Sequence, residues 1–307
     1  MELCHENELT TAIKEEISLV KATKKWWPIF VLPTLLAFVI GFVVPFVEGL
    51  YLSFCKFITI NKATWVGIGN YVKVFEDPQF WDSLSFTASF TVVSTILINV
   101  AAFAIALVLT KEIAGTNVFR TVYFMPNLIG GIVLGYIWNI LINCVLSLSA
   151  QPLMALNTTA GYWGMIILMC WQQIGYMMII YIAGLQSIPS DYIEAARIDG
   201  ATNSQILFKV KIPNVMPSIT ICLFLTLTNS FKLFDQNLAL TGGMPSIIEN
   251  GAKVNTTELL ALNIYSTYNI SKNYHGVAQA KAVIFFLLVA VLAIAQQTLT
   301  KRKEVQQ

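Results

Sequence analysis

Long stretches without a charged side chain alternate with short polar segments along this chain of 307 residues. Asp, Glu, Lys and Arg are absent from five stretches, which are residues 26–47, 83–110, 121–190, 212–231 and 282–300. A membrane-spanning helix needs about 20 mainly apolar residues. The stretch 121–190 is long enough for two such helices, with a turn around 147–157, where Ser, Gln, Pro and Asn gather. The pattern therefore predicts six transmembrane helices, at about 27–49, 85–110, 121–143, 161–186, 214–238 and 277–299.

The composition of the chain supports the same conclusion. Hydrophobic residues make up 56% of the chain and charged residues only 12%, whereas a soluble globular domain carries about 25% charged residues. A soluble protein with a very large buried core is the alternative, and five charge-free stretches argue against it. The formal net charge of +2 is too small to indicate a nucleic-acid partner. We therefore expect an all-α integral membrane protein, with lipid headgroups near its basic residues.

The basic residues are distributed unequally between the two sides of the predicted helices. If the N-terminus lies inside, the inner segments carry Lys14, Lys21, Lys24, Lys25, Lys111, Arg120, Arg197, Lys209, Lys211, Lys301, Arg302 and Lys303. The outer loops carry only Lys56, Lys62, Lys73, Lys253 and Lys272. The positive-inside rule then places both termini, residues 1–26 and 301–307, in the cytoplasm, together with the polar segment 187–213. Helical spacing of apolar residues over 9–22 predicts either a short amphipathic helix or a solvated tail.

Helix start and stop signals occur within the polar segment 187–213. Asp191 and Glu194 have the spacing of a capping box, which satisfies free backbone N–H groups at a helix start. The helix should then run over about 192–199. It should stop at Gly200, since glycine tolerates the left-handed conformation of many helix ends.

A second helix is predicted after this glycine. Thr202 followed by Gln205 repeats the start signal, and the helix should end before Pro213, which cannot continue it. The segment is thus expected to be two helices joined at a glycine corner on the cytoplasmic side. The first helix would expose an apolar patch formed by Tyr192, Ile193, Ala196 and Ile198.

The residues of this segment also match a known pattern. The matching positions are Glu194, Ala195, Ala196, Gly200, Val210, Ile212 and Pro213. The segment resembles the cytoplasmic coupling loop of ABC-importer permeases, the membrane subunits driven by a separate ATPase. The resemblance implies that the loop docks into a groove of the ATPase, where Glu194 faces a basic residue and Gly200 sets the angle between the two helices. The residues that it assigns to coupling are Glu194, Ala195, Ala196, Asp199, Gly200, Ala201 and Pro213. The structural alternative is an amphipathic loop that rests on lipid headgroups.

Other segments narrow the resemblance to one group of importers. Residues 65–71 (WVGIGNY) and 75–81 (FEDPQFW) look like the first outer loop of carbohydrate importers of the oligosaccharide-uptake group. Residues 119–126 (FRTVYFMP) look like their third-span start, and 233–236 (LFDQ) and 240–245 (LTGGMP) like their fifth-span exit. The likeness is closest to the F-type half of maltose permeases and the A-type half of glycerol-phosphate permeases. Two departures are the Met before the last Pro and a short first outer loop, which lacks the extra domain of the maltose protein.

The resemblance also implies the partners of the chain. They are a second, different permease subunit, two ATPase subunits and an extracytoplasmic sugar-binding protein, in a bacterial cytoplasmic membrane. ATP and Mg²⁺ would bind to the ATPase, because this chain has no GxxxxGK[ST] phosphate loop. We expect no catalytic site, no cofactor and no metal site in the chain itself. Cys55 and Cys144 would both lie outside, so a bridge between them is open, although no cysteine spacing indicates a disulfide framework or a zinc site.

Polar side chains within the predicted spans are candidates for the path of the cargo. Such residues are costly in hydrocarbon and usually face a bundle interior or a cavity. The resemblance assigns the path to Gln172, Gln173, Tyr176, Thr226, Ser230 and Leu233. The alternative for each is a helix–helix hydrogen bond, worth about 1 kcal/mol. Lys232 and Asp235 are expected to neutralise one another, and Gly131 and Gly135 form a GxxxG motif that predicts helix packing.

Three alternatives to a sugar importer remain. A same-fold importer for glycerol phosphate or another polyol would favour an Arg in the path, whereas Arg120 and Arg197 are expected in the cytoplasm. An ion-coupled secondary transporter would need carboxylates within the spans, but Glu48 and Asp235 lie near span ends. A membrane-embedded enzyme would need a catalytic constellation, and none is evident. The sequence does not identify the sugar.

Overall fold

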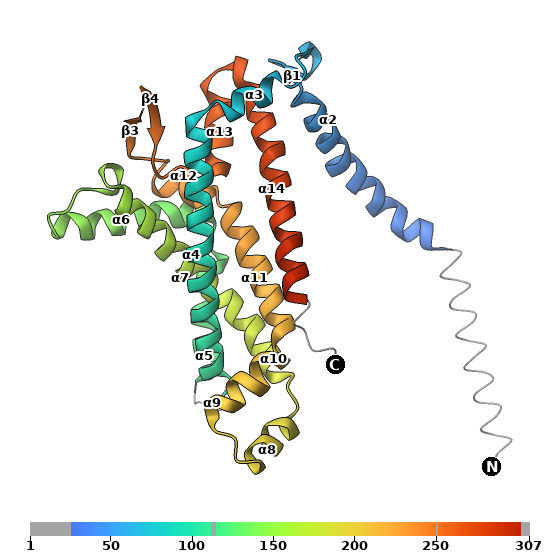
Figure 1. The fold of residues 1–307 in the computed structure, drawn as a ribbon, viewed down its shortest axis with the longest axis vertical. Coiled ribbons are helices and arrows are strands. Elements are labelled where there is room, and N and C mark those ends of the chain that lie inside the picture. The colour runs from blue at the N-terminus through green and yellow to red at the C-terminus, as the bar shows by residue number, and fades with distance from the viewer. Residues whose placement is uncertain (1–25, 112–114, 250, 302–307) are drawn as a thin grey trace.

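The computed structural model describes residues 26–111, 115–249 and 251–301, and long helices dominate these residues (Figure 1). The helices long and apolar enough to cross a membrane are Trp26–Leu52, Pro78–Leu109 (α4), Gly131–Leu148 (α6), Thr158–Gln186 (α7) and Lys272–Lys301, most of which is α14 (His275–Lys301). A bent pair, Asn203–Asn214 and Met216–Phe231, passes the same test together. The described residues therefore contain five or six candidate spans, in agreement with an all-α membrane protein. The proposed helix at 9–22 and the tail after Lys301 lie outside the described residues.

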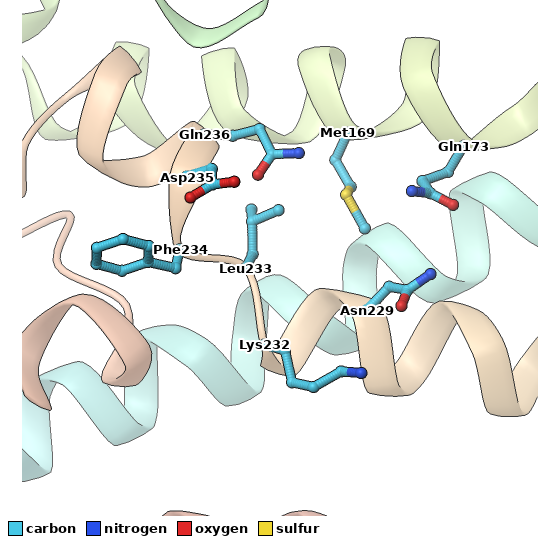
Figure 2. Close-up of a pocket in the computed structure, with 8 residues that line it drawn as sticks. All are labelled: Met169, Gln173, Asn229, Lys232, Leu233, Phe234, Asp235 and Gln236. Carbon is cyan, nitrogen blue, oxygen red and sulfur yellow. The ribbon is translucent and has the colours of Figure 1, made fainter. Parts of the chain in front are cut away.

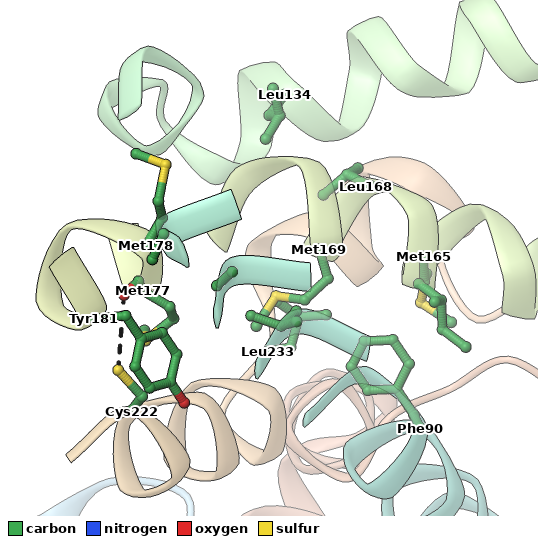
Figure 3. Packing of buried hydrophobic residues seen from close by; sticks show 14 of the residues in the cluster. Phe90, Leu134, Met165, Leu168, Met169, Met177, Met178, Tyr181, Cys222 and Leu233 are labelled. Carbon is green, nitrogen blue, oxygen red and sulfur yellow. Dashed lines mark hydrogen bonds between the residues drawn. The ribbon is translucent and has the colours of Figure 1, made fainter. Parts of the chain in front are cut away.

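The centre of the molecule is a bundle of α4, α7 and α11 (Met216–Phe231), which pack against one another. Their facing side chains form an apolar cluster in which Phe90, Met169 and Tyr181 are almost fully buried (Figure 3). Several methionines of α7 belong to it, and these flexible side chains fill irregular gaps between helices. On the other side of α11, α14 completes the bundle and also packs against α13 (Leu260–Ile270).

The first helix stands apart from this bundle. Trp26–Leu52 contains a π-helical stretch, Val39–Val43, followed by α2 (Val44–Leu52), and none of its most apolar 18-residue window is buried. Figure 1 shows it running obliquely away from the other helices, and α2 contacts α14. Because the helix is apolar on all sides, it needs lipid or another protein around it.

The third predicted span differs from the observed structure. Instead of one helix over 121–143, the chain forms α5 (Thr116–Phe124), a 3₁₀ turn (Met125–Leu128) and then α6, which continues to Leu148. The physical reason is Pro126, the second residue of the turn, which lacks a backbone N–H and cannot continue α5. The break separates a short amphipathic helix from the apolar one.

The fifth predicted span, over 214–238, is also interrupted. A helix over Asn203–Asn214 bends by 69° before α11 begins at Met216. At its other end α11 stops at Phe231, and a separate helix, α12 (Asp235–Leu240), follows after an irregular stretch. The first break lies at Val215, where the sequence stays apolar. The second coincides with the end of the charge-free stretch at Phe231, but the predicted span continued across Lys232 and Asp235 to 238.

Short elements gather at the end of the bundle opposite the polar segment 187–213 (Figure 1). They comprise the antiparallel pair β1 (Cys55–Lys56) and β2 (Thr64–Trp65), the antiparallel pair β3 (Ser246–Glu249) and β4 (Ala252–Asn255), the helix α3 (Gly69–Phe75), and 3₁₀ turns at Ile60–Lys62, Met154–Leu156 and Lys272–Tyr274. The cysteines Cys55, Cys144, Cys170 and Cys222 are all free. The bridge between Cys55 and Cys144 that the sequence left open is therefore not present.

An ion pair between the buried Lys281 and the partly exposed Asp77 joins three helices at this end, and the sequence analysis did not identify it. The side chain of Lys281 is 1% exposed, and its Nζ donates to Asp77 Oδ2 at 2.7 Å, to Asn263 Oδ1 at 2.7 Å and to Thr267 Oγ1 at 2.8 Å. All three ammonium donors are thereby satisfied. Asp77 also caps the start of α4 by accepting from the backbone N–H of Gln79. The network ties α4, α13 and α14 together.

Candidate functional site

The polar segment forms a helix, a tight turn and a second helix, as the sequence predicted. The first helix, α8, spans Ser190–Ile198, and Gly200 follows with φ +77°, in the left-handed region. The N–H of Ala201 donates to the carbonyl of Ala196, and the N–H of Gly200 donates to that of Arg197. These two bonds form a Schellman motif, in which glycine is favoured because a Cβ would be strained at positive φ. The turn therefore depends on Gly200.

The two predicted start signals had different outcomes. Thr202 and Gln205 form a complete capping box, as predicted, before the short helix α9 (Asn203–Gln205). The capping box of Asp191 and Glu194 is wrong, because α8 begins two residues earlier than predicted, at Ser190, with Pro189 as its N-cap and no side-chain cap. The proline adopts the extended conformation that precedes a helix, so Asp191 lies inside the first turn.

The second helix also extends further than predicted. After α9 the chain continues as a π-helix, Ile206–Lys211, and then as α10 (Ile212–Asn214). Pro213 lies near the start of α10 and not beyond the helix, so the predicted end before Pro213 is wrong. A proline is tolerated in a first helical turn, and the helix instead stops at Val215, where the chain bends toward α11.

Apolar side chains are exposed on this segment, which lies at the far end of the bundle from the β3–β4 hairpin (Figure 1). Tyr192 is 54% exposed, Ile198 85% and Phe208 67%. Ile193 is half-buried and packs toward the bundle core, so it does not belong to the exposed patch. Of the predicted coupling residues, Glu194, Ala195, Asp199 and Gly200 are exposed, whereas Ala196, Ala201 and Pro213 are half-buried. Phe208 lies in the π-helical stretch of the second helix and was not among the predicted patch residues.

A cavity of about 350 Å³ lies where α11 stops and α12 begins (Figure 2). Its lining residues are Met169, Gln173, Asn229, Lys232, Leu233, Phe234, Asp235 and Gln236. α7 contributes the first two, and the broken helix contributes the rest. Discontinuous helices form binding sites in many transporters, because irregular backbone is tolerated at membrane depth only where protein or a cavity surrounds it.

Gln173 and Leu233, two of the predicted path residues, line this cavity. Gln172 lies beside it: its Oε1 accepts from Gln236 Nε2 at 2.8 Å, and its Nε2 donates to the carbonyl of Ile129 at 3.3 Å. Gln172 thus holds the start of α12 against α7.

Three other predicted path residues lie away from this cavity. Thr226 and Ser230 are completely buried and hydrogen-bonded to α4. Thr226 Oγ1 accepts from Asn99 at 2.8 Å, and the hydroxyls of Ser230 and Ser94 lie 3.0 Å apart. Tyr176 is half-buried and packs against the apolar cluster. In this structure Thr226 and Ser230 fit the alternative of helix–helix hydrogen bonding.

Lys232 and Asp235 do not neutralise one another. The ion pair found within the described ranges joins Lys281 to Asp77, and Figure 2 shows Lys232 and Asp235 pointing apart. Lys232 follows the C-terminus of α11, and Asp235 begins α12. Each charge therefore lies at the helix end that favours its sign. Both line the cavity. The lining residues that the sequence did not assign to the path are Met169, Asn229, Lys232, Phe234, Asp235 and Gln236.

The GxxxG motif brings α6 against α12, as predicted. A Cβ added to Gly135 would lie 2.6 Å from the Cβ of Ala239, and one added to Gly131 would lie 2.8 Å from the Cβ of Asp235. No group of three or more His, Cys, Asp and Glu side chains suited to a metal occurs in the described part of the chain. The observed features are thus an exposed helical loop at one end and a polar cavity within the bundle.

These features define a membrane-spanning subunit of a transport system. Residues 90–305 match the family described as binding-protein-dependent transport system inner membrane component, and the chain belongs to this family.

Three relatives are similar to the chain along almost their whole length. It is 43% identical to the probable starch degradation products transport system permease protein AmyD of Thermoanaerobacterium thermosulfurigenes, over 92% of this chain and 96% of that protein. It is 31% identical to the multiple sugar-binding transport system permease protein MsmF of Streptococcus mutans, over 92% and 97%. It is 28% identical to the sn-glycerol-3-phosphate transport system permease protein UgpA of Brucella abortus, over 88% and 92%.

Solved structures share the fold. A chain of a bacterial ABC transporter involved in the import of the acidic polysaccharide alginate matches with a TM-score of 0.76 at 20% identity, over 93% of this chain and 99% of that chain. The same transporter in complex with a pentasaccharide-bound periplasmic protein matches with a TM-score of 0.75. At this identity the likeness concerns the fold alone.

Proposed function

We propose that this chain is the transmembrane permease subunit of an ATP-driven, binding-protein-dependent ABC importer for an oligosaccharide. The observation that carries the proposal is the exposed segment 187–213, which contains the loop from Glu194 to Pro213. Tyr192, Ile198 and Phe208 present apolar surface there, and Ala195 is small enough for close approach of a partner. The coupling residues would be Glu194, Ala195, Ala196, Asp199, Gly200, Ala201 and Pro213.

The connectivity of the loop suits a coupling role. It follows α7 and leads into α11, and both of these helices contribute residues to the cavity. A displacement of α8 would therefore act on Gln173 from one side and on Lys232 from the other. Transport requires that the ATPase favour different permease states as it binds and hydrolyses ATP, and a loop that binds its two conformations unequally meets that condition.

The cavity at the helix break supports a polyhydroxylated cargo. The amides of Gln173, Asn229 and Gln236 provide donors and acceptors for hydroxyl groups. Lys232 and Asp235 add one donor group and one acceptor group with opposite charges, so an uncharged sugar meets no net repulsion. The sugar-related names of AmyD and MsmF support the same cargo class. Thr226, Ser230 and Tyr176 would then contact the cargo in another conformation of the transporter, or they would only hold the helices together.

Glycerol phosphate or another polyol is the second candidate cargo, and the likeness to UgpA favours it. A phosphate dianion would gain from Lys232 but would be repelled by Asp235 in the same cavity. Ion-coupled transport is the remaining alternative. It predicts uptake that collapses with an uncoupler and survives loss of the ATPase.

We further propose the assembly and its location. The chain would pair with a different permease, two ATPase subunits and an extracytoplasmic sugar-binding protein, in a bacterial cytoplasmic membrane with both termini inside. The detached helix Trp26–Leu52 supports a permease partner, since no residue of its apolar window is buried in its own chain. ATP and Mg²⁺ would bind to the ATPase subunits, and this chain would carry no catalytic role.

A charge reversal in the loop tests the coupling assignment. In transporter reconstituted in proteoliposomes with its binding protein, Glu194→Lys should abolish uptake and cargo-stimulated ATP hydrolysis, because it repels the expected basic residue of the ATPase. Membrane insertion should be unchanged, since Glu194 is exposed. Ser204→Lys, at another exposed position of the same segment, is the matched control and should transport normally. Normal uptake by Glu194→Lys would refute the coupling role.

The cargo is tested separately, on the binding protein encoded beside this gene. Calorimetric titration with a panel of neutral oligosaccharides and with glycerol phosphate should give binding only to oligosaccharides. Binding of glycerol phosphate alone would replace the sugar proposal and leave the coupling proposal intact.

A further inference from the structure

A second cavity, of about 340 Å³, lies between α5 and α7 and is separate from the cavity at the helix break. Its lining residues are Arg120, Thr121 and Phe124 of α5 and Ile179, Ile182, Ala183 and Gln186 of α7. α5 begins near the end of α4 that approaches the loop, and α7 ends where the loop begins. The two helices therefore run in opposite directions beside the cavity.

This arrangement separates polar from apolar residues along the cavity. Arg120, Thr121 and Gln186 lie toward the loop end of the bundle. Phe124 and Ile179 lie deeper, because α5 enters the bundle where α7 leaves it. The cavity thus has a cationic, hydrogen-bonding end at the proposed cytoplasmic side and an apolar end toward the membrane interior. A molecule with an anionic head and a hydrocarbon tail would match both ends.

The guanidinium group of Arg120 is only partly satisfied. Its Nη2 donates to the carbonyl of Leu109, the last residue of α4, at 3.0 Å, and its Nε is buried with no hydrogen-bond partner in the described ranges. The bond to Leu109 fixes the side chain beside the cavity. The planar fork of an arginine has further N–H donors, which suit the oxygens of a phosphate.

We propose that this cavity binds an anionic phospholipid of the inner leaflet. The phosphate would lie against Arg120, with Thr121 and Gln186 as neutral hydrogen-bonding groups. The start of an acyl chain would contact Phe124, Ile179 and Ile182. Basic pockets between transmembrane helices on the cytoplasmic side recognise lipid headgroups in this way. The bound lipid would contact both helices and stabilise the packing of α5 against the part of α7 that leads into the proposed coupling loop.

Native mass spectrometry of the assembled transporter, released from detergent with added lipid, tests the proposal. Phosphatidylglycerol should be retained in preference to phosphatidylethanolamine, and Arg120→Gln should reduce that preference by about tenfold, as expected for loss of one hydrogen bond to a charged group. Lys111→Gln removes an exposed cation that does not line the cavity and is the matched control. An equal loss in Lys111→Gln would mean general surface attraction and would overturn the site.

A second variant leaves the bond between Arg120 and Leu109 in place. Ala183→Trp fills the middle of the cavity from an exposed position and should also release phosphatidylglycerol. Retention of the lipid by this variant would overturn the cavity as its location. Inorganic phosphate at millimolar concentration should not displace the lipid, and displacement would indicate a simple phosphate site. Lipid bound by the isolated subunit but absent from the assembled transporter would show that a protein partner covers the cavity, which also contradicts the proposal.

Discussion

Gly200 is the residue on which the geometry of the proposed coupling loop most directly depends. Gly200→Pro cannot adopt φ +77° and lacks the N–H that donates to Arg197, so it should abolish uptake. Gly200→Ala keeps the N–H and should weaken the turn by about 1–2 kcal/mol, with reduced uptake. Uptake into cells, normalised to the permease in the membrane by immunoblot, measures both effects. Ser204→Ala is the control, and unimpaired uptake by Gly200→Pro would contradict the role of the turn.

Lys281 gives a residue-scale prediction about stability. Lys281→Met removes the cation between Asp77, Asn263 and Thr267 and leaves a carboxylate without its partner. Removing one partner of a fully buried ion pair costs about 3–5 kcal/mol, and the cost here should be smaller because the side chain of Asp77 is 32% exposed. The midpoint of thermal unfolding in detergent should therefore fall clearly below that of Lys272→Met, which changes an exposed lysine. Equal midpoints for the two variants would show that the ion pair does not stabilise the bundle.

At the scale of the helices, the close packing of α6 and α12 shapes the cavity at the helix break. Gly135→Val would place a branched side chain against Ala239 and force the two helices apart, at a cost of about 1–3 kcal/mol. Because α12 carries Asp235 and Gln236 into the cavity, cargo-stimulated ATP hydrolysis should fall while basal hydrolysis persists. Ile140→Val, on an exposed face of α6, should behave as the unmodified protein. If cargo stimulates ATP hydrolysis normally in Gly135→Val, the packing of α6 against α12 is not required for the response to cargo.

The helices also show how far the sequence could predict the structure. Apolar stretches located α4 and α7 well, because the membrane imposes one simple requirement on every spanning helix. The glycine turn and the capping box of Thr202 were predictable, since their bonds join neighbouring residues. The break between α11 and α12 was not, because it is supported by contacts from distant segments, such as Gln236 with Gln172. Gln173 and Leu233 were predicted, whereas the other residues that line the cavity were missed for the same reason.

For the whole molecule, the proposed transport function depends on how the loop and the cavity are placed relative to one another. The exposed loop lies at one end, the ion pair of Lys281 lies near the other, and the polar cavity lies along helices that connect to the loop. α7 and α11 both belong to the central apolar cluster, so in the proposed mechanism a displacement at the loop would be transmitted through closely packed helices.

The detached first helix allows a test of how the whole molecule assembles. Deletion of residues 1–48 removes a helix that buries nothing in its apolar window and retains Leu52, which packs with Cys55 and Phe57. The midpoint of thermal unfolding of the remaining bundle should therefore fall only slightly, because the deletion removes few contacts with it, such as that of Phe46 with Phe286 of α14. Copurification with the partner permease should be lost, because in the proposed assembly the deleted helix packs against that subunit. An unrelated apolar helix in its place should not restore copurification. Restoration would show that membrane anchoring alone is required, and undiminished copurification after deletion would contradict the proposed contact.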